Sequence, residues 1–506
     1  MDEHAAQRIA RNTAWFTIGS ILQKLISFGY FTVVAMAFGQ EGTGQYFFAL
    51  AFTALFAVAA DWGIAPVLTR ETAKDREGTA SYVVSAFALR AMSTVVVVGV
   101  VTLFSYVLNH DDATRQMIGL ATVVMVLDSI HLGCYAVLRG LQRVSYEAIG
   151  LAVGQLVLAV TGIGILVLLA DLRINAGATP LLTIGRPIAP IWLLVPYLVA
   201  SIAHIAIAVF GTVRERAWRA RARRSLGETW RSILAMATPF AIAGGLARVY
   251  TYMDTFLLRT LLAASGVAVA TVGIYSVAFK ITFAFQFIPL AFMGALYPAM
   301  SALATRNRQQ LSTLFTQALR VLWIVALPIA FGIGTLAYRI IPLLYGEAFR
   351  ASVVPLIILI AALPFIFANF PAGNLLNAID RQTLNTKLLA IATVVNVIAN
   401  IVLIPPFAAV GAAISALVSS VTLFAVNLVA LRRNVHYAAH AVLDPFLRTT
   451  AACLVMTAGI ALLHELPLAA LIGVGVVLYV VALVLLGGIS FADIQKIRRT
   501  FRPASV

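Results

Sequence analysis

The chain is divided into about fourteen apolar stretches, each long enough to cross a lipid bilayer as an α-helix. A membrane-spanning helix needs about 20 mostly apolar residues, because it rises about 1.5 Å per residue across a hydrocarbon core about 30 Å thick. By this criterion we predict spans at residues 13–38, 44–69, 80–108, 114–138, 146–170, 188–212, 230–262, 270–300, 311–336, 352–378, 384–404, 409–431, 444–463 and 468–489. Soluble domains are about one-quarter charged, whereas this chain is 11% charged and 61% hydrophobic. We therefore predict an all-α integral membrane protein.

The lysines and arginines give these spans an orientation. If the N-terminus is cytoplasmic, five of the 36 basic residues fall in outer segments and seven within spans, which leaves 24 on the inner side. This asymmetry satisfies the positive-inside rule and requires an even number of spans, so we predict that both termini are cytoplasmic. The net charge of +16 is scattered among the spans, which indicates contacts with anionic lipids and not with nucleic acid.

The longest polar segment lies near the middle of the chain and is rich in arginine. We predict that Arg214–Arg224 forms a cytoplasmic interfacial helix, with Trp218 at the level of the lipid headgroups. This segment suggests a division into an N-terminal six-helix lobe at 1–213, a basic linker at 214–229, a C-terminal six-helix lobe at 230–435, and two additional helices with a basic tail at 436–506.

Two short motifs recur across this midpoint. Gly44–Tyr46 opens the second predicted span and Gly273–Tyr275 opens the eighth, an offset of 229 residues. Leu138–Arg143 follows the fourth span and Leu376–Arg381 follows the tenth, an offset of 238 residues. Repeated halves related by an axis normal to the membrane are typical of transporters, so we predict two related six-helix bundles.

The sequence contains no motif that is typical of an ATPase, a metalloprotease or a serine hydrolase, so we expect a transporter and not an enzyme. The adjacent acids Asp111 and Asp112 lie in a short outer segment, and we interpret them as a solvated turn. The two cysteines, Cys134 and Cys453, fall in apolar stretches, so we interpret both as buried packing residues and expect no metal site.

Charges within the spans are the remaining candidates for function. Each costs at least about 2.5–3.5 kcal/mol at a helix centre, so such groups usually face a bundle interior or a wet cavity. The basic candidates are Lys24, Arg90, Arg248, Arg259 and Lys280, and the acidic ones, which could pair with them or bind a coupling ion, are Asp61, Asp128 and Asp254. The excess of basic groups predicts a cationic cavity that attracts an anion. The alternative is that each charge is paired within the bundle.

Two histidines also lie within spans. His131 follows Asp128 by three residues, which places both on one helix face. We interpret these two residues as a packing pair, with a proton relay as the alternative, and we interpret His204 in the same way.

Several short motifs, taken in order, resemble those of the polysaccharide-biosynthesis flippases. These proteins form the O-antigen (Wzx-type) branch of the multidrug/oligosaccharidyl-lipid/polysaccharide (MOP) exporter superfamily. The motifs are Arg8–Trp15, Gly39–Tyr46, Asp61–Gly63, Leu68–Glu71, Arg248–Asp254, Val272–Tyr275, Ala278–Lys280 and Phe287–Pro289 through Tyr297-Pro298, and the resemblance covers residues 8–435.

The resemblance implies a V-shaped transporter in which two six-helix lobes surround a cavity that opens alternately to either side. The implied substrate is an oligosaccharide linked to undecaprenyl pyrophosphate, which would be flipped to the outer leaflet of a bacterial or archaeal cytoplasmic membrane. Arg248, Asp254 and Lys280 lie in the matching motifs, whereas Lys24 and Arg90 are chosen by depth alone. No cofactor is expected, and the coupling ion is left open between H⁺ and Na⁺. Membrane lipids and other glycan-assembly proteins are the implied partners.

The extra C-terminal helix pair resembles that of the fourteen-span members of the superfamily, which include lipid II flippases. Two alternatives stay open. A drug/cation antiporter of the same superfamily would need a net acidic cavity. A glycan polymerase or ligase would need a large outer loop, but the longest one here, 171–187, carries only Asp171, Arg173 and Arg186 as charged residues.

Overall fold

The computed structural model describes residues 3–74, 79–175, 182–215, 217 and 226–488. The first half contains α1 (Glu3–Asp61), α2 (Ile64–Lys74), α3 (Thr79–Val107), α4 (Asp112–Gly140), α5 (Val144–Leu168), β1 (Leu172–Ile174), β2 (Leu182–Ile184), η1 (Pro190–Leu193) and α6 (Val195–Arg214). The second half contains α7 (Leu226–Leu261), η2 (Ala263–Ser265), α8 (Ala268–Ala284), α9 (Phe287–Arg306), α10 (Arg308–Tyr345), η3 (Glu347–Ser352), α11 (Val353–Ala361), α12 (Leu363–Ala378), α13 (Gln382–Val435), α14 (Ala439–Leu462) and α15 (Leu468–Leu485). Most of the predicted interfacial helix, including Trp218, lies outside the described residues.

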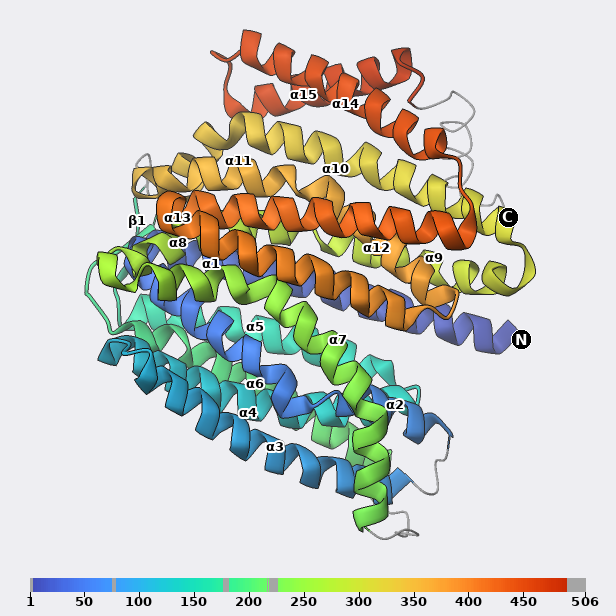
Figure 1. Cartoon of the computed structure of the whole chain (residues 1–506). Coiled ribbons are helices and arrows are strands. Elements are labelled where there is room, and N and C mark those ends of the chain that lie inside the picture. Colours follow the sequence, from blue (N-terminus) through green and yellow to red (C-terminus); the bar gives the residue numbers. More distant parts are fainter. Residues whose placement is uncertain (1–2, 75–78, 176–181, 216, 218–225, 489–506) are drawn as a thin grey trace, which may run out of the picture.

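Twelve helical segments in the described part of the chain are long and apolar enough to cross a membrane. Two of them, Ile21–Asp61 and Gln382–Val435, are each interrupted by a non-helical residue, Gly39 in α1 and Ala408 in α13. Figure 1 shows the chain reversing its direction at both breaks. Dividing these two segments adds two spans to the twelve, which agrees with the expected fold of about fourteen.

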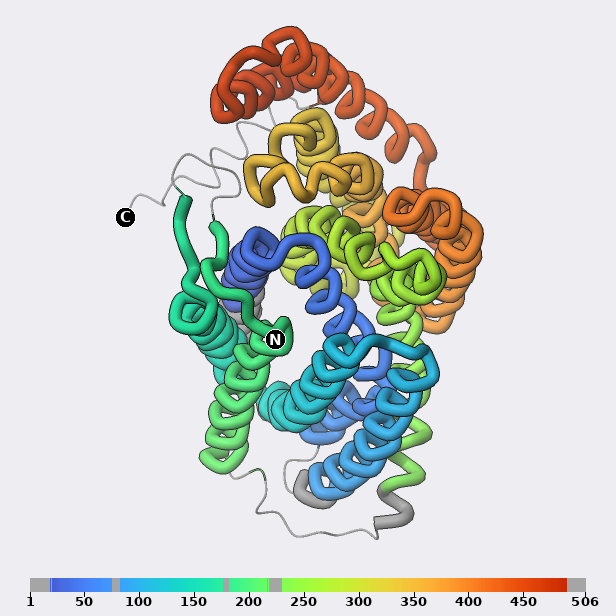
Figure 2. Tube along the Cα trace, turned by 90° about the vertical axis from the view of Figure 1, so that its left-hand side faces the viewer, coloured from blue at the N-terminus to red at the C-terminus, as the bar shows by residue number. Residues whose placement is uncertain are grey.

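The helices form two bundles with a peripheral pair. Helices α1 to α6 make up most of one bundle and α7 to α13 most of the other, while α14 and α15 pack outside α10 (Figures 1 and 2). We call the side of the molecule opposite the N-terminus the far side. The largest buried cluster joins the two bundles towards this side and includes Phe31 and Phe48 from α1, Tyr275 from α8 and Tyr345 from α10.

The repeated motifs of the two halves pack directly against each other. A Cβ atom at Gly44 in α1 would lie 2.0 Å from the carbonyl oxygen of Val269, and a Cβ atom at Gly273 in α8 would lie 2.0 Å from that of Gln40. Only glycine allows two backbones to approach this closely. The motif that suggested an internal repeat therefore lies at the crossing point of α1 and α8.

Several predicted boundaries were wrong. The predicted span 44–69 ends at Asp61, because Trp62 and Gly63 both have positive φ and turn the chain into α2. The predicted spans 270–300 and 352–378 are each broken, at 285–286 and at Ala362, with Pro289 and Pro364 just beyond the breaks. Within the outer loop 171–187, the strands β1 and β2 pair in antiparallel register.

Candidate functional site

Three of the predicted basic residues come together between the two bundles. Lys24 of α1, Arg248 of α7 and Lys280 of α8 form this cation cluster, in which Lys24 lies close enough to the other two for their charges to interact. None of the three forms an ion pair or hydrogen bond with any residue that the structure describes. Among the described residues, these three charges therefore contradict the alternative that every charge within a span is paired.

Aromatic rings contact the lysines of the cation cluster. The Lys280 Nζ atom lies 5.3 Å from the centre of the Phe31 ring and 5.8 Å from that of Phe47, both in α1. The Lys24 Nζ atom lies 6.0 Å from the Phe283 ring. Such cation–π contacts contribute about 0.5–2 kcal/mol each and leave the charge free to meet an anion. The cluster thus combines positive charge with low-dielectric walls, which strengthens attraction of an anionic group.

The other two basic candidates lie elsewhere and are paired. Arg90 of α3 is 2% exposed and forms an ion pair with Asp61, and its guanidinium also donates to the carbonyl oxygen of Ser129 at 2.5 Å. Arg259 lies at the far end of α7 and contacts Asp111 at 3.1 Å. Asp111 also caps α4 and is 44% exposed, so the exposed turn that we predicted has the further roles of capping α4 and pairing with Arg259.

The third acid, Asp254, lies in a buried polar cluster of the C-terminal bundle. Its carboxylate accepts hydrogen bonds from the Tyr275 hydroxyl at 2.7 Å and from Asn400 Nδ2 at 2.6 Å. Asn400 Nδ2 also contacts Asn396 Oδ1 at 3.1 Å, whereas Asn400 Oδ1 has no partner. No basic side chain of the described residues pairs with Asp254. A buried carboxylate that is surrounded by neutral hydroxyl and amide groups is suited to bind a proton or a small cation.

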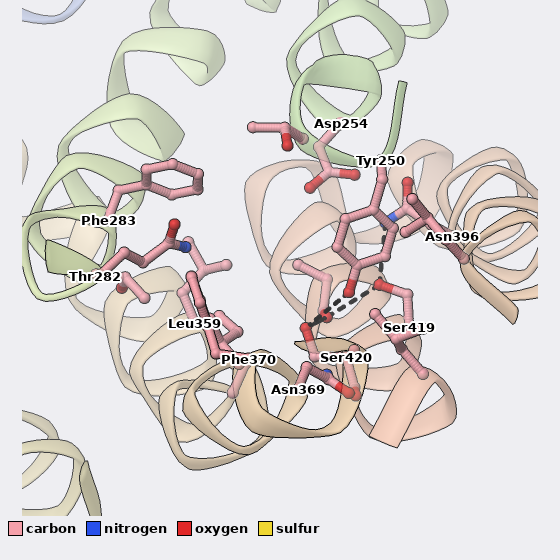
Figure 3. A pocket seen from close by; sticks show the side chains of 18 of the residues that line it. Tyr250, Asp254, Thr282, Phe283, Leu359, Asn369, Phe370, Asn396, Ser419 and Ser420 are labelled. Carbon is pink, nitrogen blue, oxygen red and sulfur yellow. Dashed lines mark hydrogen bonds between the residues drawn. The ribbon is translucent and has the colours of Figure 1, made fainter. Parts of the chain in front are cut away.

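A cavity of about 380 Å³ opens beside Asp254, between α7, α8, α12 and α13 (Figure 3). Phe279, Phe283 and Phe370 contribute to its apolar wall. Its polar wall is dominated by amides, namely Asn369, Asn374, Asn377, Asn385, Asn396, Asn427 and Gln286. This amide-lined cavity was not predicted, because the candidate residues were chosen from the charges and histidines within the spans. The repeated asparagines in otherwise apolar segments between 369 and 427 were the available signal.

The histidines within the spans lie together in the N-terminal bundle. The His131 and His204 rings stack with their centres 4.6 Å apart, and the Tyr135 hydroxyl lies 3.3 Å from His204 Nδ1. His131 Nδ1 lies 3.6 Å from Asp128 Oδ1, which accepts a hydrogen bond from Ser201 at 2.6 Å. The group therefore includes a carboxylate, two imidazoles and a phenol.

A second cavity is almost wholly apolar. It has a volume of about 360 Å³ and lies between α10 and the peripheral pair, lined by residues such as Pro328, Gly332 and Ile340 on one side and Ile460 and Val476 on the other. Its lining suits a hydrocarbon chain.

Comparison with known proteins places the chain in a family. The sequence model described as "Polysaccharide biosynthesis protein" matches residues 9–304, more than half of the chain. The chain belongs to the polysaccharide biosynthesis protein family.

Two relatives come from Haloferax volcanii. The "Probable low-salt glycan biosynthesis flippase Agl15" is 22% identical over 83% of this chain and 82% of its own length. The "Probable flippase AglR" is 28% identical over 34% of this chain and 35% of its own.

Solved structures establish the fold class of this family member. A lipid II flippase MurJ structure in an inward closed conformation superposes with a TM-score of 0.73 over 96% of this chain and 99% of that one, at 13% identity. The Vibrio cholerae MATE transporter VcmN superposes with a TM-score of 0.58 over 85% and 97%, at 15% identity. The predicted architecture, an all-α fold of the MOP type, is therefore confirmed.

Proposed function

We propose that the protein is a flippase that moves a lipid-linked oligosaccharide, of the undecaprenyl-pyrophosphate type, from the cytoplasmic to the outer leaflet by alternating access. The observation that carries this proposal is the cation cluster of Lys24, Arg248 and Lys280, which has no acidic partner among the described residues. A pyrophosphate presents several anionic oxygens, and arginine and lysine are the side chains that bind such groups best. A cationic drug would be repelled by the same cluster.

The family and the relatives support this substrate class. The chain matches the polysaccharide biosynthesis family, and a relative aligned over most of its length is described as a glycan biosynthesis flippase. A structure with the same fold is described as a lipid II flippase. In our proposal, the apolar cavity between α10 and the peripheral pair α14–α15 receives part of the lipid tail, and the sugar and pyrophosphate enter between the bundles.

The orientation follows the distribution of basic residues. We propose that the N-terminal side faces the cytoplasm and the far side faces outward, in the cytoplasmic membrane. The two bundles share their largest buried cluster towards the far side, and Arg259 and Asp111 pair across them there. In this arrangement, the far side is closed and the substrate would load from the cytoplasm.

The Asp254 cluster is our candidate for the coupling ion, which we propose to be Na⁺ or H⁺. Two groups contact the carboxylate, and the neighbouring Asn400 Oδ1 lacks a donor, so a cation or proton would complete the hydrogen-bonding of the cluster. The Asp128–His131–His204 group is a second place where a proton could bind.

Reconstitution tests the proposed function. The purified protein in liposomes with a fluorescent lipid-linked oligosaccharide is expected to flip the lipid, while Arg248→Ala and Lys280→Ala lose most of this activity and still insert normally. Arg350→Ala is the matched control, because Arg350 is exposed at the far side and, among the described residues, pairs with Glu347 alone. Undiminished flipping by both cluster variants would refute the anion site.

A further inference from the structure

We propose that the amide-lined cavity of the C-terminal bundle is a subsite for an uncharged sugar unit of the lipid-linked substrate. This inference rests on the proposed function for the identity of the lipid that carries the sugar. The subsite adds a specificity that a phosphate-binding cluster alone does not supply, because every polyprenyl pyrophosphate presents the same phosphates.

The lining of the cavity has the chemistry of sugar recognition. Six asparagines and one glutamine line it, and its described lining includes no lysine or arginine. Each amide offers two donor hydrogens and an acceptor oxygen, which complement hydroxyl groups that both donate and accept. The one acid in the lining, Asp254, is already bonded to Tyr275 and Asn400. Apart from the Asp254 carboxylate, the described lining is polar without being charged, which suits a neutral sugar better than an anion.

One amide in the wall has an unused acceptor. Asn427 is 1% exposed, and its Nδ2 atom donates to Asn369 Oδ1 at 3.1 Å, whereas its Oδ1 atom has no partner. Asn369 in turn donates to the carbonyl oxygen of Ser420 at 3.2 Å, and the Ser420 hydroxyl lies 3.1 Å from that of Tyr250 (Figure 3). A buried acceptor without a donor costs about 1–3 kcal/mol. A sugar hydroxyl in the cavity would supply the missing hydrogen.

The remaining wall and the volume fit one sugar ring. Phe279 and Phe283 stack on each other at 4.4 Å and line the cavity together with Phe370. Flat apolar rings of this kind pack against the C–H face of a pyranose while the amides bind its hydroxyl groups. The volume of about 380 Å³ lies at the lower end of the range of about 300–1,000 Å³ that is typical of small-molecule sites.

The cavity lies next to the cation cluster, as a sugar linked directly to a pyrophosphate requires. The ring of Phe283 lines the cavity, and the Lys24 ammonium lies 6.0 Å from its centre. Lys280 directly follows Phe279, another wall residue, on α8. A pyrophosphate at the cluster would therefore place its first sugar at the cavity mouth.

A binding comparison between two lipids tests the subsite. The probes are undecaprenyl pyrophosphate alone and undecaprenyl pyrophosphate carrying one N-acetylglucosamine, measured against the full-length protein in nanodiscs. We expect the wild-type protein to bind the sugar-bearing lipid about tenfold more tightly, which corresponds to about 1.4 kcal/mol. Asn427→Leu should bring the ratio of the two affinities close to one and leave binding of the sugar-free lipid unchanged. A ratio near one in the wild-type protein, or an unchanged ratio in the variant, would overturn the proposal.

A second variant guards against misfolding of the first. The side chain of Asn374 lines the cavity and, among the described residues, donates to the carbonyl oxygen of Phe370 in its own helix alone, so Asn374→Leu is expected to fold. Asn434→Leu is its matched control, because Asn434 makes the same bond to Ala430 outside the cavity. The ratio of the affinities for the sugar-bearing and sugar-free lipids should fall in Asn374→Leu and persist in Asn434→Leu. Equal ratios in the two variants would count against the subsite. Lys280→Ala should weaken the binding of both lipids equally. If this is the one result that fails, it would refute the phosphate site and not the sugar subsite.

Discussion

Replacing Gly44 with alanine tests whether the crossing of α1 and α8 holds the far side closed. The new Cβ atom would lie 2.0 Å from the carbonyl oxygen of Val269, 1.4 Å short of the 3.4 Å at which ordinary contacts begin. It would also lie 3.1 Å from the backbone nitrogen of Gly273. Both obstructing atoms belong to the backbone of α8, so no change of side-chain rotamer can relieve the clash. The two helices must move apart.

The size of the effect follows from this geometry. Overpacking in a well-packed core costs about 1–3 kcal/mol. This cost applies to the state with a closed far side, in which the two helices cross closely, and not to the state in which they have separated. The equilibrium between the two states therefore shifts by the whole difference in cost. The population with a closed far side should therefore fall about 5- to 150-fold relative to the population in which the bundles have separated there.

Distances between spin labels measure this shift. Asn109→Cys and Ala264→Cys place labels at exposed positions on the far side of each bundle, and both native cysteines are buried and should not react. The labelled Gly44→Ala protein should show a new population at longer distance. Gly29→Ala is the control in the part of α1 that precedes the break at Gly39, because a Cβ atom there meets nothing within 4 Å. A Gly44→Ala distribution identical to the wild-type one would refute the reasoning.

Three further predictions concern charges near these sites. Asp111→Asn removes the ion pair with Arg259; because Asp111 is 44% exposed, we expect at most about a fivefold gain of the open far side with the same labels, and no gain would show that the pair contributes nothing. His110 directly precedes Asp111 in the turn between α3 and α4. Burial, reinforced by the charge of Arg259, lowers the pKa of His110 to about 4, so the thermal stability present above pH 6.5 should fall as the pH drops from about 6.5 towards 4. His110→Phe should flatten that part of the pH profile, and an unchanged slope would contradict this. Asp254→Asn should abolish the dependence of flipping on an imposed Na⁺ or H⁺ gradient while lipid binding persists; unaltered gradient dependence would exclude Asp254 as the coupling site.

The regular features of the fold follow from the sequence because the bilayer imposes them. A span must be long and apolar, and basic residues collect on one side, so the span pattern can be predicted without a structure. Irregular backbone follows weaker rules. The break at Ala408 depends on a non-glycine residue with a φ of 50°, and β1 and β2 are only three residues each. Local signals of that kind are too short to predict alone.

The pairing of charges could not be predicted in the same way. Depth identified Lys24 and Arg90 equally well as candidates, but the structure leaves one without an acid and pairs the other with Asp61 from a different helix. Which charges meet depends on the packing of helices that are distant in sequence. The amide-lined cavity was missed for another reason, because asparagine carries no charge and each one is unremarkable until six of them line a single cavity.

Helix α8 links the features on which these proposals depend. Gly273 contacts the backbone of α1, Tyr275 binds Asp254, Lys280 belongs to the cation cluster, and Phe283 lines the cavity beside it. These positions span fewer than three turns of one rigid helix. A shift of α8 against α1 would therefore change the far-side contact, the candidate ion site and the cation cluster together. Opening of the far side and release of the anion would then be a single event, because the helix that closes the far side also presents one of the cations.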